Sequence, residues 1–166
     1  DMRDVTELAH KMFPGRPIFL LGHSMGSLAA RIYIKENDAD IYGLILCGTP
    51  FRNRFTGLGR KLFETIVRFG GGRIRPEIFQ KLTSAGYNRN FRKEGHQVWT
   101  CSDPQVRQSV AVDPLCNYYC TANASYNLLC MPDEAYSEKG WKTVSKKMGI
   151  FLLSGGDDPC TKNGSS

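Results

Sequence analysis

The sequence has no apolar run of the roughly 18 residues that a membrane-spanning helix needs. Its 17 glycines and 8 prolines follow no period, which excludes collagen-like and solenoid architectures. No basic segment followed by an apolar one opens the chain, so no signal peptide is recognisable and we expect a cytoplasmic protein. The 166 residues, 41% apolar and 23% charged, have the composition of one ordinary globular domain with its own core.

The six cysteines form no C-x-x-C pair, the spacing found in many zinc and redox sites. Cys116 and Cys120 could share one helix face, and Cys101 or Cys130 would be the only further soft ligands for a zinc ion. Cys47 lies inside an apolar run, and the chain is too large to need disulfides. We therefore predict ordinary thiols, buried or partly buried, with no metal and no cofactor.

The net charge of +6 is concentrated in one stretch of the chain. Residues 51–95 contain eleven Lys or Arg against three Glu, a balance of +8, whereas the remainder has eleven against thirteen, or −2. A solvated helical surface, nucleic acid, an anionic substrate or an anionic membrane would each account for such a stretch. We predict no nucleic-acid partner and keep an anionic membrane surface as a partner hypothesis.

Three short apolar runs, each bounded by Gly or Pro, predict the strands of a parallel sheet. They are residues 18–21, residues 44–46 with Ile41 just before, and residues 150–153. Continuous apolar character is typical of strands that are buried on both faces. Residues 25–35 carry apolar side chains at helical spacing, so the first two strands and this helix form a βαβ unit. The fold class is therefore α/β, with a further short helix over residues 4–12.

The stretch between the second and third strands is predicted to be a helical insertion. One helix runs to about residue 69 and is ended by three glycines, residues 70–72. Pro76 and Glu77 open another helix. Asp103 as N-cap and Pro104 at the first helical position open a third.

The most specific motif is Gly-His-Ser-Met-Gly at residues 22–26, directly after the first strand and directly before a helix. This is the context of a G-x-S-x-G nucleophile elbow. Ser24 must occupy a tight, strained turn that presents its hydroxyl at the carboxyl end of the strand. We expect Gly22 and Gly26 to be required because a Cβ at either position would clash. The Met25 N–H at the helix start can face a developing oxyanion.

A second polar turn, Gly-Gly-Asp-Asp-Pro at residues 155–159, follows the last predicted strand. An acid at this edge of the sheet can orient a catalytic histidine. Asp158 is the first choice for this role and Asp157 the second. We predict that Ser24 and the acid lie at the same edge, because both follow parallel strands.

Four stretches together resemble the α/β-hydrolase superfamily, in its lysophospholipase and monoacylglycerol-lipase-like branch that is grouped with serine aminopeptidases. They are residues 17–28, 43–50, 113–126 and 151–159. The resemblance implies a Ser24 nucleophile, an Asp158 triad acid, and a helical cap over residues 51–125 that shapes an acyl pocket. Residues 1–50 and 126–166 then correspond to the hydrolase core.

The resemblance also implies a catalytic histidine after the last core strand, but no histidine follows Asp158. His23 is next to Ser24, where adjacent side chains diverge, His10 lies on the first helix, and His96 lies in the cap. We therefore expect the chain to be an internal piece of a larger enzyme, with the triad His outside it.

The function implied is a serine esterase acting on a small-molecule acyl ester or lipid. The aromatic residues of the cap suit an acyl chain, and suit an ordinary helical core equally well: Phe51, Phe55, Phe63, Phe69, Phe79, Tyr87, Phe91 and Trp99. Peptidase, thioesterase and acyltransferase activities use the same residues. The alternative from a different functional class is a non-catalytic binding module that has the same fold and lacks the catalytic base.

Overall fold

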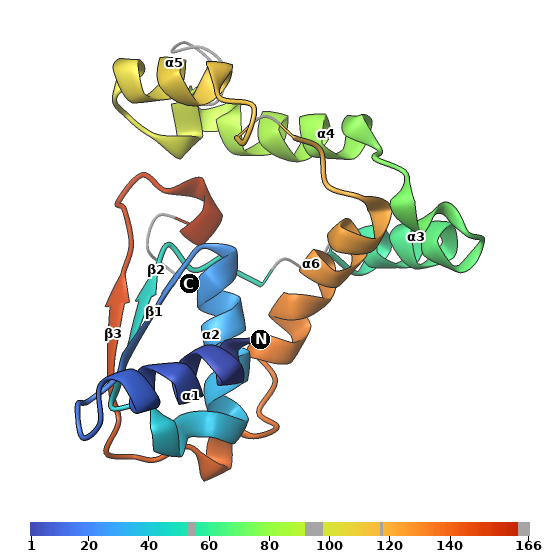
Figure 1. Ribbon diagram of the computed structural model, residues 1–166. Helices are drawn as coiled ribbons and strands as arrows, with labels where there is room; N and C mark the ends of the chain where they lie inside the picture. The colour runs from blue at the N-terminus through green and yellow to red at the C-terminus, as the bar shows by residue number, and fades with distance from the viewer. Residues whose placement is uncertain (53–55, 92–97, 117, 163–166) are drawn as a thin grey trace. The chain divides into compact units, whose positions relative to one another are not determined.

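The computed structural model describes residues 1–52, 56–91, 98–116 and 118–162, which fold into two compact units (Figure 1). The first unit combines Asp1–Asn53 with Cys130–Ser166, and the second is Arg54–Leu129. The first unit holds the sheet and the predicted site residues. The second is helical wherever it has regular structure among the described residues.

Three parallel strands form the sheet of the first unit, in the order β1-β2-β3. They are β1 (Phe19–His23), β2 (Gly43–Cys47) and β3 (Gly149–Leu153). The register pairs His23 with Cys47 and Cys47 with Leu153, so the three strands end level with one another. This confirms the predicted α/β class and the three predicted strands.

Two helices cover one face of this sheet (Figure 1). Helix α1 (Met2–Met12) is capped by Asp1, and α2 (Met25–Asn37) connects β1 to β2, with a short 3-10 turn, η1 (Asp38–Asp40), before β2. The buried core joins α2 to the middle strand and comprises Ala30, Tyr33, Ile34, Ile41, Leu44 and Leu46. Ser27 and Ala30 are almost completely buried, because small side chains let α2 lie close to the sheet.

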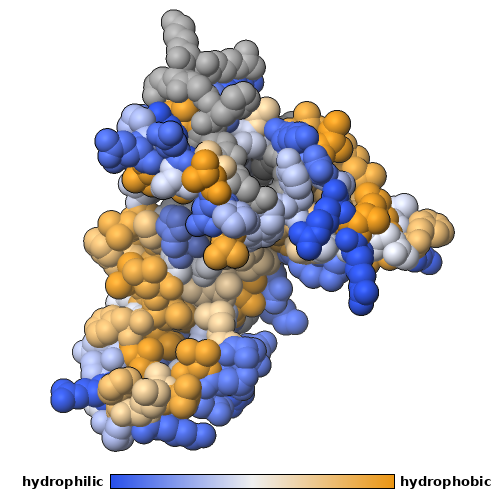
Figure 2. All heavy atoms as spheres, turned by 45° about the horizontal axis from the view of Figure 1, so that its top comes forward, coloured by the Kyte–Doolittle hydropathy of each residue, from blue (hydrophilic) through white to orange (hydrophobic). Residues whose placement is uncertain are grey.

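The prediction that all three strands are buried on both faces is correct for β2 and wrong for the outer strands. No residue of β2 is exposed, whereas every residue of β3 is, and β1 alternates, with Phe19 and Leu21 exposed. Among the described residues each outer strand has one neighbour, and α1 and α2 cover one face only. Figure 2 shows hydrophobic side chains at the surface of this part of the molecule. A hollow lined by Phe19, Tyr42 and Phe151 lies at the beginning of the strands, away from the predicted site.

Three helices of the second unit agree with the sequence prediction, the first at its end and the other two at their beginnings. They are α3 (Thr56–Arg68), α4 (Glu77–Tyr87) and α5 (Pro104–Val112), with short 3-10 turns η2 (Gly71–Arg73), η3 (Asn88–Phe91) and η4 (Val98–Thr100). Gly70 adopts a φ of 84° after α3, which a glycine tolerates without strain. Asp103 accepts hydrogen bonds from the first-turn amides of α5, as an N-cap should.

Helix α6 (Ala122–Ala135) was not predicted. It contains Pro132, which lacks the amide hydrogen that a helix interior uses, so the sequence reads as a helix stop there. It also has a weakly amphipathic pattern, because its polar and apolar residues are mixed around the axis. A short turn, η5 (Trp141–Thr143), connects this region to β3.

Aromatic contacts form the core of the second unit. The rings of Phe63 and Phe79 meet edge to face, 4.5 Å between centroids, and Phe63 is 1% exposed. The rings of Tyr87 and Trp99 lie 4.7 Å apart. These members of the predicted aromatic set therefore pack against each other, whereas Phe69 is 83% exposed and Phe55 lies outside the described residues.

The six cysteines are free thiols, of which Cys160 is buried and Cys116 exposed. The alternative in which Cys116 and Cys120 share a helix face does not occur, because α5 ends at Val112 and α6 begins at Ala122. Among the described residues, no three His, Cys, Asp or Glu side chains gather as metal ligands would. No helix in those ranges has both the length and the hydropathy to cross a membrane.

Candidate active site

Ser24 occupies a strained position between β1 and α2. It has φ 50° and ψ −119°, and it is one of two non-glycine residues with positive φ in the described chain. Such a conformation costs on the order of 1–3 kcal/mol and persists only where its surroundings fix it. Here the Ser24 N–H donates to the Cys47 carbonyl at 2.9 Å, and the Ser24 carbonyl accepts from the Ser27 N–H at 2.9 Å. The turn is thus fixed both to the neighbouring strand and to the first turn of the helix.

The steric prediction for the two motif glycines is confirmed at Gly22 and wrong at Gly26. A Cβ added to Gly22 would lie 2.7 Å from the Ser27 Cα and would also collide with the Gly26 carbonyl. A Cβ added to Gly26 meets nothing within 4 Å. The crowding is one-sided because the Gly22 position faces the backbone of the helix start, whereas the Gly26 position faces outward.

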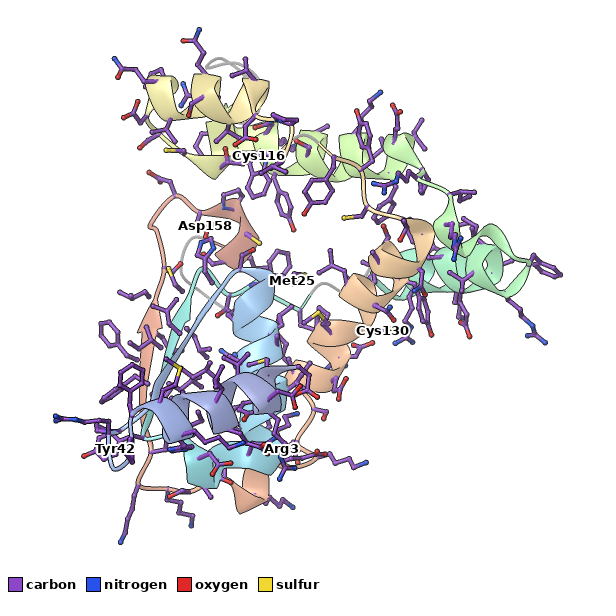
Figure 3. The ribbon with its side chains drawn as sticks, in the orientation of Figure 1. Arg3, Met25, Tyr42, Cys116, Cys130 and Asp158 are labelled. Carbon is purple, nitrogen blue, oxygen red and sulfur yellow. The ribbon has the colours of Figure 1, made fainter. Side chains whose placement is uncertain are left out.

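The hydroxyl and the backbone amide that a nucleophilic reaction would use lie at the start of α2. Ser24 is partly buried, and no hydrogen bond joins its hydroxyl to another group of the described ranges. Met25 is the first residue of α2, so its N–H lacks an acceptor within the helix and lies at the positive end of the helix dipole. Figure 3 shows Met25 and Asp158 at the same end of the sheet.

Asp158 caps the 3-10 turn η6 (Pro159–Thr161), which follows β3. One carboxylate oxygen, Oδ1, accepts from the Cys160 N–H at 2.8 Å. The Thr161 N–H and hydroxyl both donate to the Asp158 carbonyl, and Thr161 is 0% exposed. Asp157 is exposed, and of the two acids only Asp158 is both partly buried and fixed by its own turn.

Gly48 lies between the two predicted site residues and was missed by the sequence analysis. Its N–H donates to the Leu153 carbonyl at 2.9 Å, and its φ is 56°. The point that a Gly48 Cβ would occupy is 3.4 Å from Asp158 Oδ2 and 3.5 Å from His23 Nε2. The ends of all three strands therefore meet around a residue without a side chain. The signal in the sequence was a glycine directly after the middle strand.

Within the described residues, no histidine is hydrogen-bonded to Ser24 or Asp158 to complete a catalytic triad. The ring of His23 faces Gly48, and no hydrogen bond or ion pair in the described chain joins it to Ser24 or Asp158. His10 is exposed on α1, and His96 lies outside the described residues. The described chain thus brings together a hydroxyl, a carboxylate and a helix N-terminus at one edge of a parallel sheet, the edge at which open α/β sheets place their sites.

Comparison with known proteins decides the family. Residues 1–166 match the serine aminopeptidase S33 family of hydrolases. The chain belongs to this family, within the α/β-hydrolase superfamily. No curated protein matches the sequence.

Three solved structures share the fold. A thermostable carboxyl esterase from Bacillus coagulans, in complex with glycerol, has a TM-score of 0.88 at 24% identity over 99% of this chain. A lipase in an open form has a TM-score of 0.82 at 19% identity over 99%. A soluble variant of the monoglyceride lipase of Saccharomyces cerevisiae, in complex with a substrate analogue, has a TM-score of 0.64 at 19% identity over 94% of this chain. This chain covers 54%, 55% and 50% of those structures, so it spans about half of their length.

Proposed function

We propose that this S33-family chain carries the nucleophile and the triad acid of a serine hydrolase that cleaves carboxylic esters. The observation that carries the proposal is the strained Ser24 turn, with φ 50°, between β1 and the first amide of α2. A turn of this kind presents a serine hydroxyl away from the strand, next to amides that can stabilise negative charge. The steric demand at Gly22 supports the same role for this turn.

The proposed reaction is acyl transfer in two steps. Ser24 Oγ attacks the acyl carbonyl carbon, its proton passes to a histidine, and the carbonyl oxygen becomes an oxyanion facing the Met25 N–H. The C–O bond to the alcohol then breaks, and the histidine returns the proton to the leaving alkoxide. Water, activated by the same histidine, hydrolyses the acyl-serine, while Asp158 holds the ring in the required tautomer.

We propose that the histidine comes from outside these 166 residues. The resemblance places the triad histidine after the last core strand, where no histidine follows Asp158 in these residues. His10 is exposed on α1, the His23 ring faces Gly48, and His96 lies outside the described residues. The space around Gly48 next to Asp158 Oδ2 is where an incoming imidazole could contact the carboxylate. The chain alone should therefore be a weak esterase, because a serine without a base attacks slowly at neutral pH.

The proposed substrates are acyl esters of the lysophospholipid or monoacylglycerol type, with the second unit serving as a cap over the acyl chain. The esterase, lipase and monoglyceride lipase among the similar structures favour an ester. The name of the family is that of a peptidase, so peptide cleavage is an alternative reaction. Peptide cleavage and acyl transfer would use the same residues. We place the protein in the cytoplasm as part of this proposal.

Ester turnover with free imidazole as the base tests the proposal. The wild-type chain and Ser24→Ala are compared on p-nitrophenyl butyrate and on an amino-acid p-nitroanilide, with and without imidazole. We expect imidazole to raise the rate of ester cleavage by the wild type well above that of Ser24→Ala, with little effect on the anilide. Equal rates for both chains would favour the non-catalytic binding module, and preferred anilide cleavage would favour a peptidase.

We also propose that the second unit binds anionic lipid surfaces, an extension that rests on helix α3. Leu58 and Leu62 are 78% and 57% exposed and lie one turn apart on α3, and Phe69, one residue beyond the end of α3, is 83% exposed. Lys61 and Arg68 are exposed on the adjacent face. Apolar side chains bordered by cations are the pattern of a surface that lies on an anionic membrane.

A further inference from the structure

Hydrogen bonds through the Pro50–Phe51 peptide and the backbone of Cys160 connect the loop that carries Asp158 to a tyrosine, Tyr136. Tyr136 lies just after α6, 22 residues before Asp158 in the sequence. Its hydroxyl donates to the Pro50 carbonyl at 2.8 Å, and Pro50 belongs to the loop after β2. All of these residues belong to the first unit.

The Pro50–Phe51 peptide group connects the Tyr136 hydroxyl to Cys160. The Pro50 carbonyl and the Phe51 N–H are the two ends of one peptide bond, and the Phe51 N–H donates to the Cys160 carbonyl at 3.0 Å. The Cys160 N–H in turn donates to Asp158 Oδ1 at 2.8 Å. The Cys160 carbonyl and the Cys160 N–H belong to the two peptide groups on either side of its Cα, so the link to the carboxylate passes through the backbone of this one residue.

The tyrosine ring is itself held in place. The Arg31 guanidinium of α2 lies over the ring, 5.0 Å from its centroid. Burial raises the pKa of Tyr136, an effect that Arg31 partly opposes and Cys160 reinforces, so the hydroxyl keeps the proton it donates at neutral pH. Tyr136 is thus contacted at its ring by Arg31 of α2, the helix whose N-cap is Ser24, and is linked at its hydroxyl to the Asp158 loop through the Pro50–Phe51 peptide.

We propose that Tyr136 is a positioning residue for the triad acid: through the Pro50–Phe51 peptide and Cys160 it fixes the Asp158 carboxylate so that Oδ2 faces Gly48. This rests on the proposed function, in which Asp158 orients the histidine. Local bonds within η6 hold the backbone of Asp158, but only the Cys160 amide holds its carboxylate among the described contacts. Losing the Tyr136 bond should let that amide, and the carboxylate with it, move.

Tyr136→Phe is the test, because it removes the hydroxyl and keeps the ring under Arg31. Tyr33→Phe is the matched control: Tyr33 lies in the core of the first unit, and its hydroxyl also donates one hydrogen bond, to Thr6 Oγ1 of α1 at 2.9 Å. Two quantities are measured, the exchange rate of the Cys160 amide hydrogen and the Ser24-dependent cleavage of p-nitrophenyl butyrate with imidazole as base.

We expect Tyr136→Phe to accelerate Cys160 amide exchange and to lower kcat on the order of tenfold at unchanged KM, since small displacements of catalytic groups cost up to about 10²-fold. In an Asp158→Asn background the same change should have no further effect on kcat, which a merely structural role would not produce. Tyr33→Phe should change neither quantity.

Unchanged Cys160 exchange in Tyr136→Phe would overturn the proposal, as would an equal loss of kcat in the Asp158→Asn background. If no variant shows Ser24-dependent turnover, the proposed esterase function fails. The amide exchange of Cys160 still decides in that case whether Tyr136 holds the Asp158 loop.

Discussion

Replacing Gly22 with alanine should destabilise the first unit, whereas the same change at Gly26 should not. The added methyl group at position 22 would lie 2.7 Å from the Ser27 Cα, against the 3.4–4 Å of ordinary contact. The obstructing atoms are backbone, so α2 has to move away from β1. Overpacking of this kind costs about 1–3 kcal/mol, which for a chain of this size corresponds to about 2–12 °C in Tm.

Gly26→Ala provides the control within the same motif. Its methyl group meets nothing within 4 Å, and alanine in a helix is favoured over glycine by about 0.5–1 kcal/mol. Thermal unfolding followed by the fluorescence of Trp141, which packs against the core of the first unit, measures both variants. A Trp99→Phe background removes the only other tryptophan. Equal stability of the two variants, or a larger loss at Gly26, would refute the steric account of this turn.

Two further predictions concern charge. Vesicles that contain anionic lipid should bind the chain more tightly than neutral vesicles, and this binding should weaken as the salt concentration rises because surface charges are screened. The double variant Leu62→Ser, Phe69→Ser should bind anionic vesicles less tightly. Equal partition onto both kinds of vesicle at all salt concentrations would contradict the proposal. The raised pKa of Tyr136 stabilises the fold below about pH 10, and that contribution is lost as pH rises through the raised pKa. The urea midpoint of the wild type should therefore fall relative to that of Tyr136→Phe above about pH 10, and a constant difference across that range would show that the Tyr136 hydroxyl is not buried.

Local signals explain why most elements could be predicted from the sequence. Strands β1, β2 and β3 are short apolar runs between glycines or prolines, and α5 has an N-cap and a proline in the expected places. Ser24 could be found because a strand, a glycine, a serine and a helix follow one another within a few residues. These features depend on neighbours in the chain, and a sequence displays them directly.

Features that depend on distant parts of the chain were not predictable in the same way. The exposure of β3 depends on what packs against it, and an apolar run carries no record of that. Helix α6 continues through Pro132 because its packing outweighs a local helix-breaking signal. The link from Tyr136 to Asp158 passes through a peptide bond, Pro50–Phe51, whose side chains give no indication of it.

The site of covalent labelling by a fluorophosphonate tests the central claim, that Ser24 is the nucleophile, most directly. The chain is incubated with the reagent and imidazole, digested with trypsin, and analysed by mass spectrometry, in which Ser24 falls in the peptide of residues 12–31. The account predicts one adduct on Ser24, no adduct on that peptide in Ser24→Ala, and slower labelling in Asp158→Asn. An adduct on another residue, or labelling of equal extent in Ser24→Ala, would contradict it.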